Sequence, residues 1–260
     1  MEKELVYLYD GSFEGLLTCV YEIYYRKDDP KKIIPKECNR FSLIEEYIQI
    51  DTDTEKFKKV YESIERKISR EFLRTVFYIY LSEEEDSGII ILDYIRTGYK
   101  FGRDVLNYQT NPHVRAANEV YRRVSYERHR YLGLLRFKML EGGVLYATIE
   151  PDHNIISMLG GHFSQRMSSE YWIIHDVKRN IAVFYNKEQW IIRSLNESID
   201  LRFDENEQSY QELWKTYYKH ISIPNRKNLR QKRAYMPTRY WKHLVEEGVQ
   251  NNGFNKTNLD

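Results

Sequence analysis

The sequence predicts an α+β fold, in which an antiparallel sheet of about five strands is flanked by a helical bundle. Three observations favour this class. Apolar side chains recur at helical spacing through the middle third of the chain, and two pairs of β-rich segments in the second half flank turn signals. Hydrophobic residues make up 42% of the 260 residues, and charged residues of both signs make up 30%. This composition is typical of a soluble globular protein with a substantial core.

The first elements are predicted from local signals. Residues 4–9 are rich in β-forming side chains and are expected to form a strand. A turn follows, and the Ser12 hydroxyl is expected to cap a helix that begins at Phe13. Two prolines favour a loop over residues 26–36, while residues 41–50 fit either a strand or a short helix.

The middle third is predicted to be a helical bundle. Apolar periodicity indicates helices over residues 54–68, 70–81, 88–101 and 111–130, with an exposed acidic turn at 83–86. Pro112 suits the first turn of the last of these helices, because a proline lacks only an N–H that would have no helical partner there.

The second half carries the strands of the predicted sheet. Residues 131–140 and 144–149 flank Glu141-Gly142-Gly143 and are expected to form a hairpin. A helix is predicted from about 153 to 167. Strands over 171–176 and 181–185 form a second hairpin, and residues 190–193 add a short edge strand.

Two helices are predicted near the end of the chain, over residues 208–221 and from Pro237 to about residue 248. We expect residues 1–250 to form a single α+β domain, with a helical subregion at about 54–130 and the sheet and basic C-terminal helices at about 131–250. Residues 251–260 are expected to be a frayed tail.

Charge is distributed unevenly, although the formal net charge is only +1. Residues 1–100 hold 16 Lys and Arg against 21 Asp and Glu, and the remainder holds 24 against 18. A polyanion is therefore expected to bind the C-terminal part.

The stretch from Leu213 to Val245 contains no Asp or Glu, yet it interleaves cations with tyrosines and tryptophans. Cations bind phosphates and flat rings stack on bases, so this pattern favours a nucleic-acid contact surface. Two amphipathic helices with a basic outer face would give the same pattern. The residues expected to bind phosphate are Arg226, Arg230, Arg233, Arg239 and Lys242, and those expected to stack on a base are Tyr235, Tyr240 and Trp241.

Three further groups of residues could carry chemistry. Arg130 and Arg136 could bind phosphate, with Glu127 or His129 as acid or base, but a network that anchors a helix to the sheet is favoured. His162 lies beside an apolar helix stripe, one turn from Arg166. In the third group, Lys178 and Arg179 could contact phosphate at a hairpin turn, while His175 and Asp176 precede them; Asp176 either caps the turn or acts as a catalytic carboxylate.

Other classes of site receive little support. His153, His162, His175 and Asp176 show no metal-ligand spacing, and no nucleotide-binding loop or serine elbow occurs. No metal and no cofactor is therefore expected. Two cysteines, no signal-peptide pattern and no long apolar run favour a reduced, cytoplasmic protein without a membrane span.

Several motifs resemble a bacterial family of an uncharacterised domain that is usually labelled probable DNA metabolism protein. The similarity runs from about Tyr7 to Glu246. Its motifs, in order, are YLYDGSFEGLLTCVYEIY at Tyr7–Tyr24, ERHRYLGLLRF at Glu127–Phe137, LYATIEPDHNII at Leu145–Ile156, GHFSQR at Gly161–Arg166, WIIHDVKRNIAVFY at Trp172–Tyr185 and MPTRYWKHLVE at Met236–Glu246.

The resemblance implies a role beside a radical-SAM protein of DNA repair or modification type, since members of the family are commonly encoded next to one. Some members are fused to a uracil-DNA-glycosylase-like domain, and this chain is expected to resemble the stand-alone form. The family supplies no catalytic residues to transfer.

The leading hypothesis is a DNA-binding accessory protein that acts with the radical-SAM partner. One alternative is an enzyme acting on a damaged or modified nucleotide, in which Glu127, His162, His175 and Asp176 converge on one cleft. Another is a protein-interaction adaptor.

Overall fold

The computed structural model describes residues 3–39, 42–195, 201–223 and 228–247. The chain divides into two compact units at Tyr126 and Glu127, and each unit is described by itself. This division does not test whether residues 1–250 fold as a single domain. The expected frayed tail, residues 251–260, lies outside the described residues. The predicted α+β class, with a mostly antiparallel five-stranded sheet and flanking helices, is confirmed.

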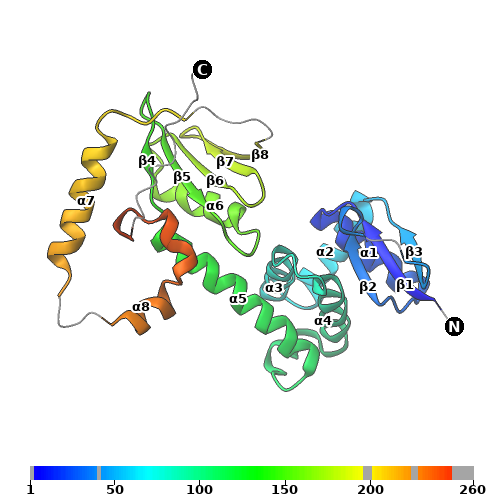
Figure 1. The fold of residues 1–260 in the computed structure, drawn as a ribbon. Helices are drawn as coiled ribbons and strands as arrows, with labels where there is room; N and C mark the ends of the chain where they lie inside the picture. The colour runs from blue at the N-terminus through cyan, green and yellow to red at the C-terminus, as the bar shows by residue number, and fades with distance from the viewer. Residues whose placement is uncertain (1–2, 40–41, 196–200, 224–227, 248–260) are drawn as a thin grey trace. The chain divides into compact units, whose positions relative to one another are not determined.

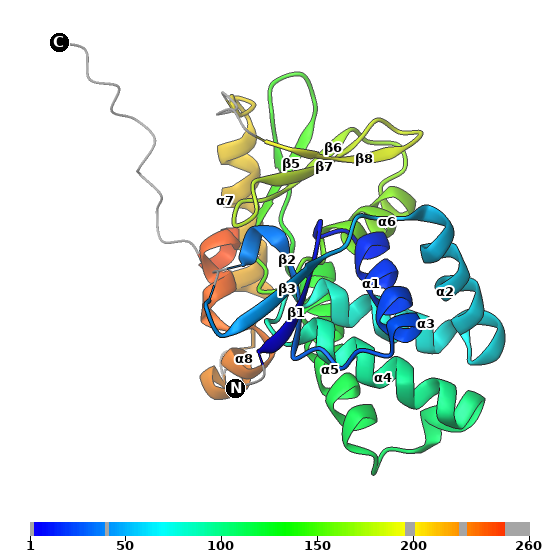
Figure 2. The same cartoon turned by 90° about the vertical axis from the view of Figure 1, so that its right-hand side faces the viewer.

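The first unit contains a parallel sheet of three strands in the order β2-β1-β3 (Figure 2). The strands are β1 (Glu4–Tyr9), β2 (Lys32–Pro35) and β3 (Glu45–Gln49). In the central strand, four successive residues from Val6 to Tyr9 are buried. Both faces of β1 are therefore covered, as is usual for a central parallel strand.

Helices account for most of the rest of this unit, and α1 and α2 lie side by side (Figure 2). The Ser12 hydroxyl caps α1 by accepting a hydrogen bond from the Gly15 N–H at 2.9 Å, as predicted. Asp53 and Ser69 cap the next two helices. The helices are α1 (Phe13–Arg26), α2 (Thr54–Lys67), α3 (Arg70–Leu81), α4 (Ser87–Phe101) and α5 (Pro112–Leu134), which runs into the second unit.

The parallel sheet was not expected from the sequence. Residues 26–36 were predicted to be a loop, but they contain β2, in which Ile33 is buried and pairs with β1. The ambiguous segment 41–50 contains β3. Both strands pair with β1, which is distant in the sequence. The prolines near β2 predict a loop from local signals alone, and local signals do not report this long-range pairing.

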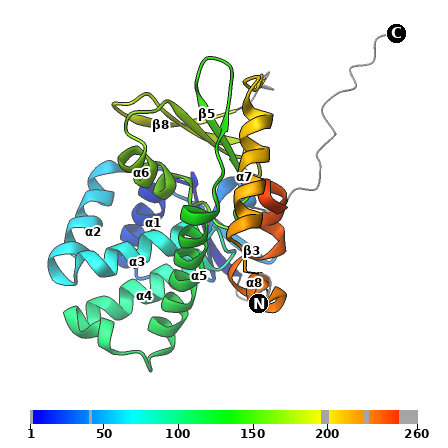
Figure 3. The same ribbon diagram turned by 90° about the vertical axis from the view of Figure 1, so that its left-hand side faces the viewer.

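The second unit contains the predicted sheet, in the order β4-β5-β6-β7-β8 (Figure 1). Figure 3 shows β5 and β8 of this sheet from another side. Only the β5–β6 pair is parallel, because α6 (Ile156–Arg166) connects the two strands. α6 packs on the sheet face that carries Val183, where Gly160 allows close approach. The strands are β4 (Lys138–Met139), β5 (Leu145–Ile149), β6 (Trp172–Asp176), β7 (Ile181–Tyr185) and β8 (Trp190–Ser194).

Two boundaries in this unit differ from the prediction. The strand expected over 131–140 shrinks to β4, because α5 continues to Leu134 and places Tyr131 against Tyr240, with ring centroids 4.9 Å apart. α6 begins three residues later than expected, after the bent segment at 151–155.

The chain then forms α7 (Glu207–Ile221), α8 (Leu229–Tyr235) and the 3₁₀ turns η4 (Thr238–His243) and η5 (Val245–Glu247). The continuous helix predicted from Pro237 is wrong, because the extended backbone of Leu244 separates η4 from η5 and buries its side chain. Among the described residues, no helix has the length and apolar character needed to cross a membrane.

Candidate functional site

The helices α7 and α8 carry exposed side chains that we call the α7–α8 surface, namely Lys215, Lys219, Arg230, Arg233 and Tyr235. On α7, Lys215 and Lys219 lie one turn apart and are exposed, and on α8, Arg230 and Arg233 lie on one side of the helix. None of these four cations forms an ion pair with a described residue. Tyr235 at the end of α8 is 73% exposed.

Several other cations of the predicted interface are held by carboxylates of their own unit. Arg239 pairs with Glu127 and Asp152, and Lys242 pairs with Glu150. These cations would have to exchange one anion for another to bind phosphate, which reduces their net gain. The same holds for Arg136, which pairs with Glu246 at 2.5 Å and lies over the Trp214 ring.

The three rings predicted to stack on a base have different environments. Tyr235 is exposed, whereas Tyr240 is only 2% exposed and donates its hydroxyl hydrogen to Glu127 at 3.0 Å. Trp241 is half-buried and donates its indole N–H to the Met236 carbonyl. Tyr240 therefore belongs to the core, and its prediction as a stacking ring is wrong. Arg226 lies outside the described residues.

Glu127 acts as a buried anchor. Its carboxylate accepts hydrogen bonds from the backbone N–H groups of Asp152 and His153, both at 2.9 Å, and from Tyr240 and Arg239. Every one of these donors comes from another segment of the unit, so the carboxylate joins α5 to the loop after β5 and to η4. This geometry matches the anchoring interpretation of the Glu127 group. Nearby, Arg130 donates to the Ala234 carbonyl of α8 at 3.4 Å.

Asp176 holds the β6–β7 turn. It is fully buried and accepts from the backbone N–H groups of Lys178 and Arg179 and from the Arg179 guanidinium at 2.9 Å. Burial raises the pKa of the Asp176 carboxyl, while Arg179 acts in the opposite direction. Lys178 and Arg179 also donate to the Asp152 carbonyl. Asp176, Lys178 and Arg179 therefore join the β6–β7 turn to the loop after β5, which agrees with the interpretation that Asp176 holds the turn.

A polar row on the sheet face opposite α6 escaped the sequence analysis. Tyr146 and His175 share a hydrogen bond at 2.8 Å, and next to them Thr148 bonds to His243 at 3.0 Å. Glu150 lies 3.5 Å from the second nitrogen of His243. Burial raises the pKa of Tyr146 to about 12 and lowers the pKa of both histidines. Strand alternation places Tyr146, Thr148 and Glu150 on one face, but nothing in the sequence places His243 there.

The four residues of the enzyme hypothesis do not gather in one place. His175 lies on the face opposite Ile174 and Asp176, while α6, which carries His162, covers the Val183 face. The Glu127 carboxylate accepts hydrogen bonds from backbone N–H groups of the loop after β5. Among the described residues, no group of three or more His, Cys, Asp or Glu side chains is placed to hold a metal ion.

His162 lies instead in a cationic group on α5 and α6. Its Nε2 and the Nε of Arg128 are buried and have no hydrogen-bond partner. Burial lowers the pKa of His162, and the charges of Arg128 and Arg166 lower it further. Arg166 is exposed and forms no ion pair with a described residue. Arg128 was not among the residues predicted to bind phosphate.

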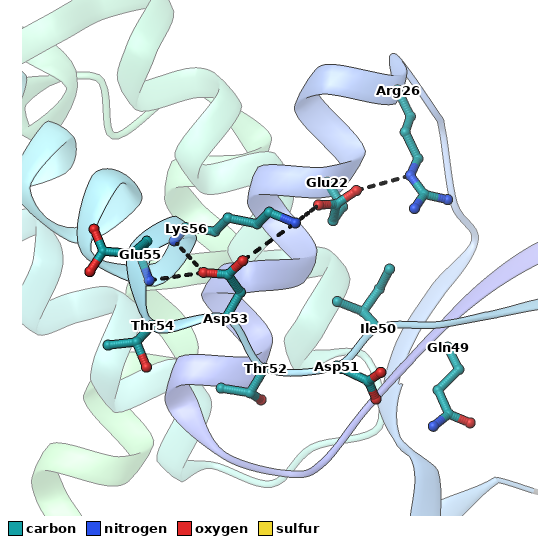
Figure 4. Close-up of a pocket in the computed structure, with 10 residues that line it drawn as sticks. All are labelled: Glu22, Arg26, Gln49, Ile50, Asp51, Thr52, Asp53, Thr54, Glu55 and Lys56. Carbon is teal, nitrogen blue, oxygen red and sulfur yellow. Dashed lines mark hydrogen bonds and ion pairs between the residues drawn. The ribbon is translucent and has the colours of Figure 1, made fainter.

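The first unit has a shallow pocket at the carboxyl end of β3 (Figure 4). Both cations of its lining are paired with an acid, because Lys56 pairs with Glu22 at 2.7 Å and Glu22 also pairs with Arg26. The Asp53 carboxylate accepts hydrogen bonds from the backbone N–H groups of Glu55 and Lys56 at the N-terminus of α2. Four acids against two cations line this pocket, so it offers no unpaired cation to an anionic ligand.

Comparison with known proteins identifies one family. A family model described as a domain of unknown function, DUF4130, matches residues 85–246, which is more than half of the chain. A search of curated proteins found no match. The matched segment contains α7, α8, the five-stranded sheet and the Glu127 anchor, and the chain belongs to the DUF4130 family.

Proposed function

We propose that this protein binds DNA through the α7–α8 surface, as an accessory protein of a DNA repair or modification system. The observation that carries the proposal is the set of four exposed cations on these two helices that form no ion pair within the described part of the chain, together with the exposed Tyr235 ring. Free cations release counterions from a nucleic acid when they bind its phosphates, and this release drives affinity. An exposed ring adds stacking on an unpaired base.

The proposed surface is smaller than the sequence alone suggests. Arg230, Arg233 and Tyr235 retain the proposed role, whereas Arg239 and Lys242 already form ion pairs with carboxylates of their own unit. Lys215 and Lys219 on α7 extend the surface along the chain. Since Arg230 and Arg233 are three residues apart on one helix, they can contact phosphates of one strand together.

The double variant Arg230→Ala/Arg233→Ala tests this proposal. We expect it to weaken binding of a labelled DNA oligonucleotide by about tenfold or more at 0.1 M salt, because two phosphate contacts are lost. The control is Arg70→Ala/Arg74→Ala, which removes two charges from exposed positions of α3. If both double variants bind as tightly as the wild-type chain, the α7–α8 surface is not the DNA site.

A second candidate function, a protein-interaction adaptor, is favoured by the apolar side of α7. Tyr210, Leu213, Tyr217 and Ile221 are each more than half exposed. Helices of globular proteins normally bury such a face. The family resemblance implies a radical-SAM protein as the partner. Tyr217→Ala/Ile221→Ala would abolish co-purification with that partner after nuclease treatment if α7 is an adaptor, and would leave it unchanged if DNA binding alone is the function.

A further inference from the structure

A second concave site lies in the first unit, and only its α4 wall falls within the segment that matches the family. It is a groove of about 740 Å³ between the C-terminal halves of α1, α2 and α4. Its apolar lining includes Ile23, Val60 and Ile95, which belong to the core. A volume of this size is typical of small-ligand sites.

Tyrosine rings form two walls of the groove. On α1, the rings of Tyr21 and Tyr25 are 4.4 Å apart, and Tyr24 meets Tyr25 edge to face at 5.5 Å. Tyr24 and Tyr25 are 73% and 65% exposed, although large rings usually seek burial. Tyr99 of α4 lines the groove as well and is 38% exposed. The groove therefore offers ring faces and edges to a flat molecule.

Cations line the same groove along α2. Lys59 lies 5.9 Å from the centre of the Tyr21 ring, and Lys67 lies 5.7 Å from that of Tyr99. Arg66 is exposed between them in the sequence. None of the three forms an ion pair with a described residue. Glu62 also lines the groove, so cations outnumber acids on α2 there.

We propose that this groove binds a nucleotide, with the base against the tyrosine rings and the phosphate on Lys59, Arg66 and Lys67. Aromatic rings beside unpaired cations suit a ligand that is flat at one end and anionic at the other. The apolar lining excludes water from the base, and the exposed cations leave the phosphate accessible. The ligand is a free nucleotide or one nucleotide of a single strand, since both present the same chemistry. The inference does not depend on the α7–α8 surface.

Titration of the full-length protein with deoxyadenosine 5′-monophosphate, followed by calorimetry, tests the proposal. We expect Tyr24→Ala and Arg66→Ala each to weaken binding at least about fivefold, the loss of one stacking or charge contact. Tyr126→Ala and Lys58→Ala are matched controls, because they remove an exposed tyrosine and an exposed α2 lysine outside the groove lining. All four positions are exposed, so the variants keep the fold.

Two further titrations separate the parts of the ligand. Deoxyadenosine, which lacks the phosphate, and ribose 5-phosphate, which lacks the base, should each bind more weakly than the nucleotide. A short single-stranded oligonucleotide added to the Arg230→Ala/Arg233→Ala protein distinguishes a strand from a free nucleotide, since the α7–α8 surface is then disabled. Three results would overturn the proposal. They are no binding of the nucleotide, binding of the nucleotide by Tyr24→Ala and Arg66→Ala as tight as by the wild-type chain, and binding of ribose 5-phosphate as tight as that of the nucleotide.

Discussion

Single buried carboxylates hold the second unit together. Glu127 receives hydrogen bonds from four groups, and Asp176 from two backbone N–H groups and a guanidinium. A buried carboxylate costs solvation free energy, which is offset only when its oxygen atoms are fully hydrogen-bonded. Both residues meet this condition, so their role is to fix loops in place.

Glu127→Ala is expected to lower the free energy of unfolding by about 3–5 kcal/mol. The substitution removes the acceptor of the buried Tyr240 hydroxyl and of two backbone N–H groups. Urea unfolding followed by circular dichroism measures the loss. Glu119→Ala, on the exposed side of the same helix, should change the stability by less than about 0.5 kcal/mol. Similar losses in both variants would show that Glu127 is not an anchor.

The row of Tyr146, His175 and His243 predicts a stability that falls in mild acid. Burial keeps the pKa of both histidines below the ordinary value of about 6.5 in the folded state, so the unfolded chain binds more protons below that pH. The free energy of unfolding should therefore be level above about pH 7 and decrease as the pH falls through 6.5.

His175→Asn tests this dependence, because asparagine can keep the hydrogen bond to Tyr146 but does not titrate. The variant should lose a fraction of the roughly 1.4 kcal/mol per pH unit that one full proton contributes. Urea unfolding at several pH values between 7.5 and 5.5 measures the slope. Identical slopes for the variant and the wild-type chain would show that His175 does not contribute.

Sequence reasoning at single residues worked where one local rule decides the outcome. Ser12 was identified as a cap because capping depends on neighbours within three residues. Whether a cation is free or paired depends instead on residues that are distant in the sequence. Lys242 and Arg233 are both cations of the same acid-free stretch, yet among the described residues only Lys242 meets a carboxylate, Glu150, which lies 92 residues away.

Close packing of helices on strands limits what the elements tolerate. Gly88, the second residue of α4, lies directly against β2, and a Cβ atom there would lie 2.2 Å from the Ile33 carbonyl oxygen. Since that oxygen belongs to backbone, it cannot rotate away. Gly133 near the end of α5 has no atom within 4 Å of its virtual Cβ.

Opposite effects are expected from the same substitution at these two helical glycines. Gly88→Ala should destabilise the chain by about 1–3 kcal/mol, because the steric clash outweighs the better helix propensity of alanine. Gly133→Ala should stabilise it by about 0.5–1 kcal/mol, which is the propensity gain alone. Urea midpoints of the two variants decide the matter, and a stabilising Gly88→Ala would show that α4 can move away from β2.

Elements were predictable in proportion to their local signals. The start of α1, the helices α2 to α4 and the β6–β7 hairpin match the predictions within about a residue, because their periodicity and turns are local. β2 and β3 pair only with the distant β1, and the η4–η5 segment is shaped by burial of Tyr240 and Leu244. No pattern within those segments encodes these long-range contacts.

Across the whole chain, the uneven charge has a simple consequence in the structure. Carboxylates of the second unit pair with many of its own cations, among them Lys232 of α8. The cations that form no ion pair with a described residue include Lys215, Lys219, Arg230 and Arg233. The net charge of +1 therefore conceals a local basic surface. Such a surface binds polyanions in a way that depends on salt concentration.

The salt dependence of DNA binding tests this interpretation most directly. The logarithm of the association constant is plotted against the logarithm of salt concentration for the wild-type chain and for Arg230→Ala/Arg233→Ala. We expect a linear decrease for the wild-type chain and, for a single-stranded oligonucleotide, a slope shallower by about 1.4 in the double variant, since two phosphate contacts are lost. Binding that does not depend on salt, or equal slopes for the two proteins, would contradict a DNA-binding role for α7 and α8.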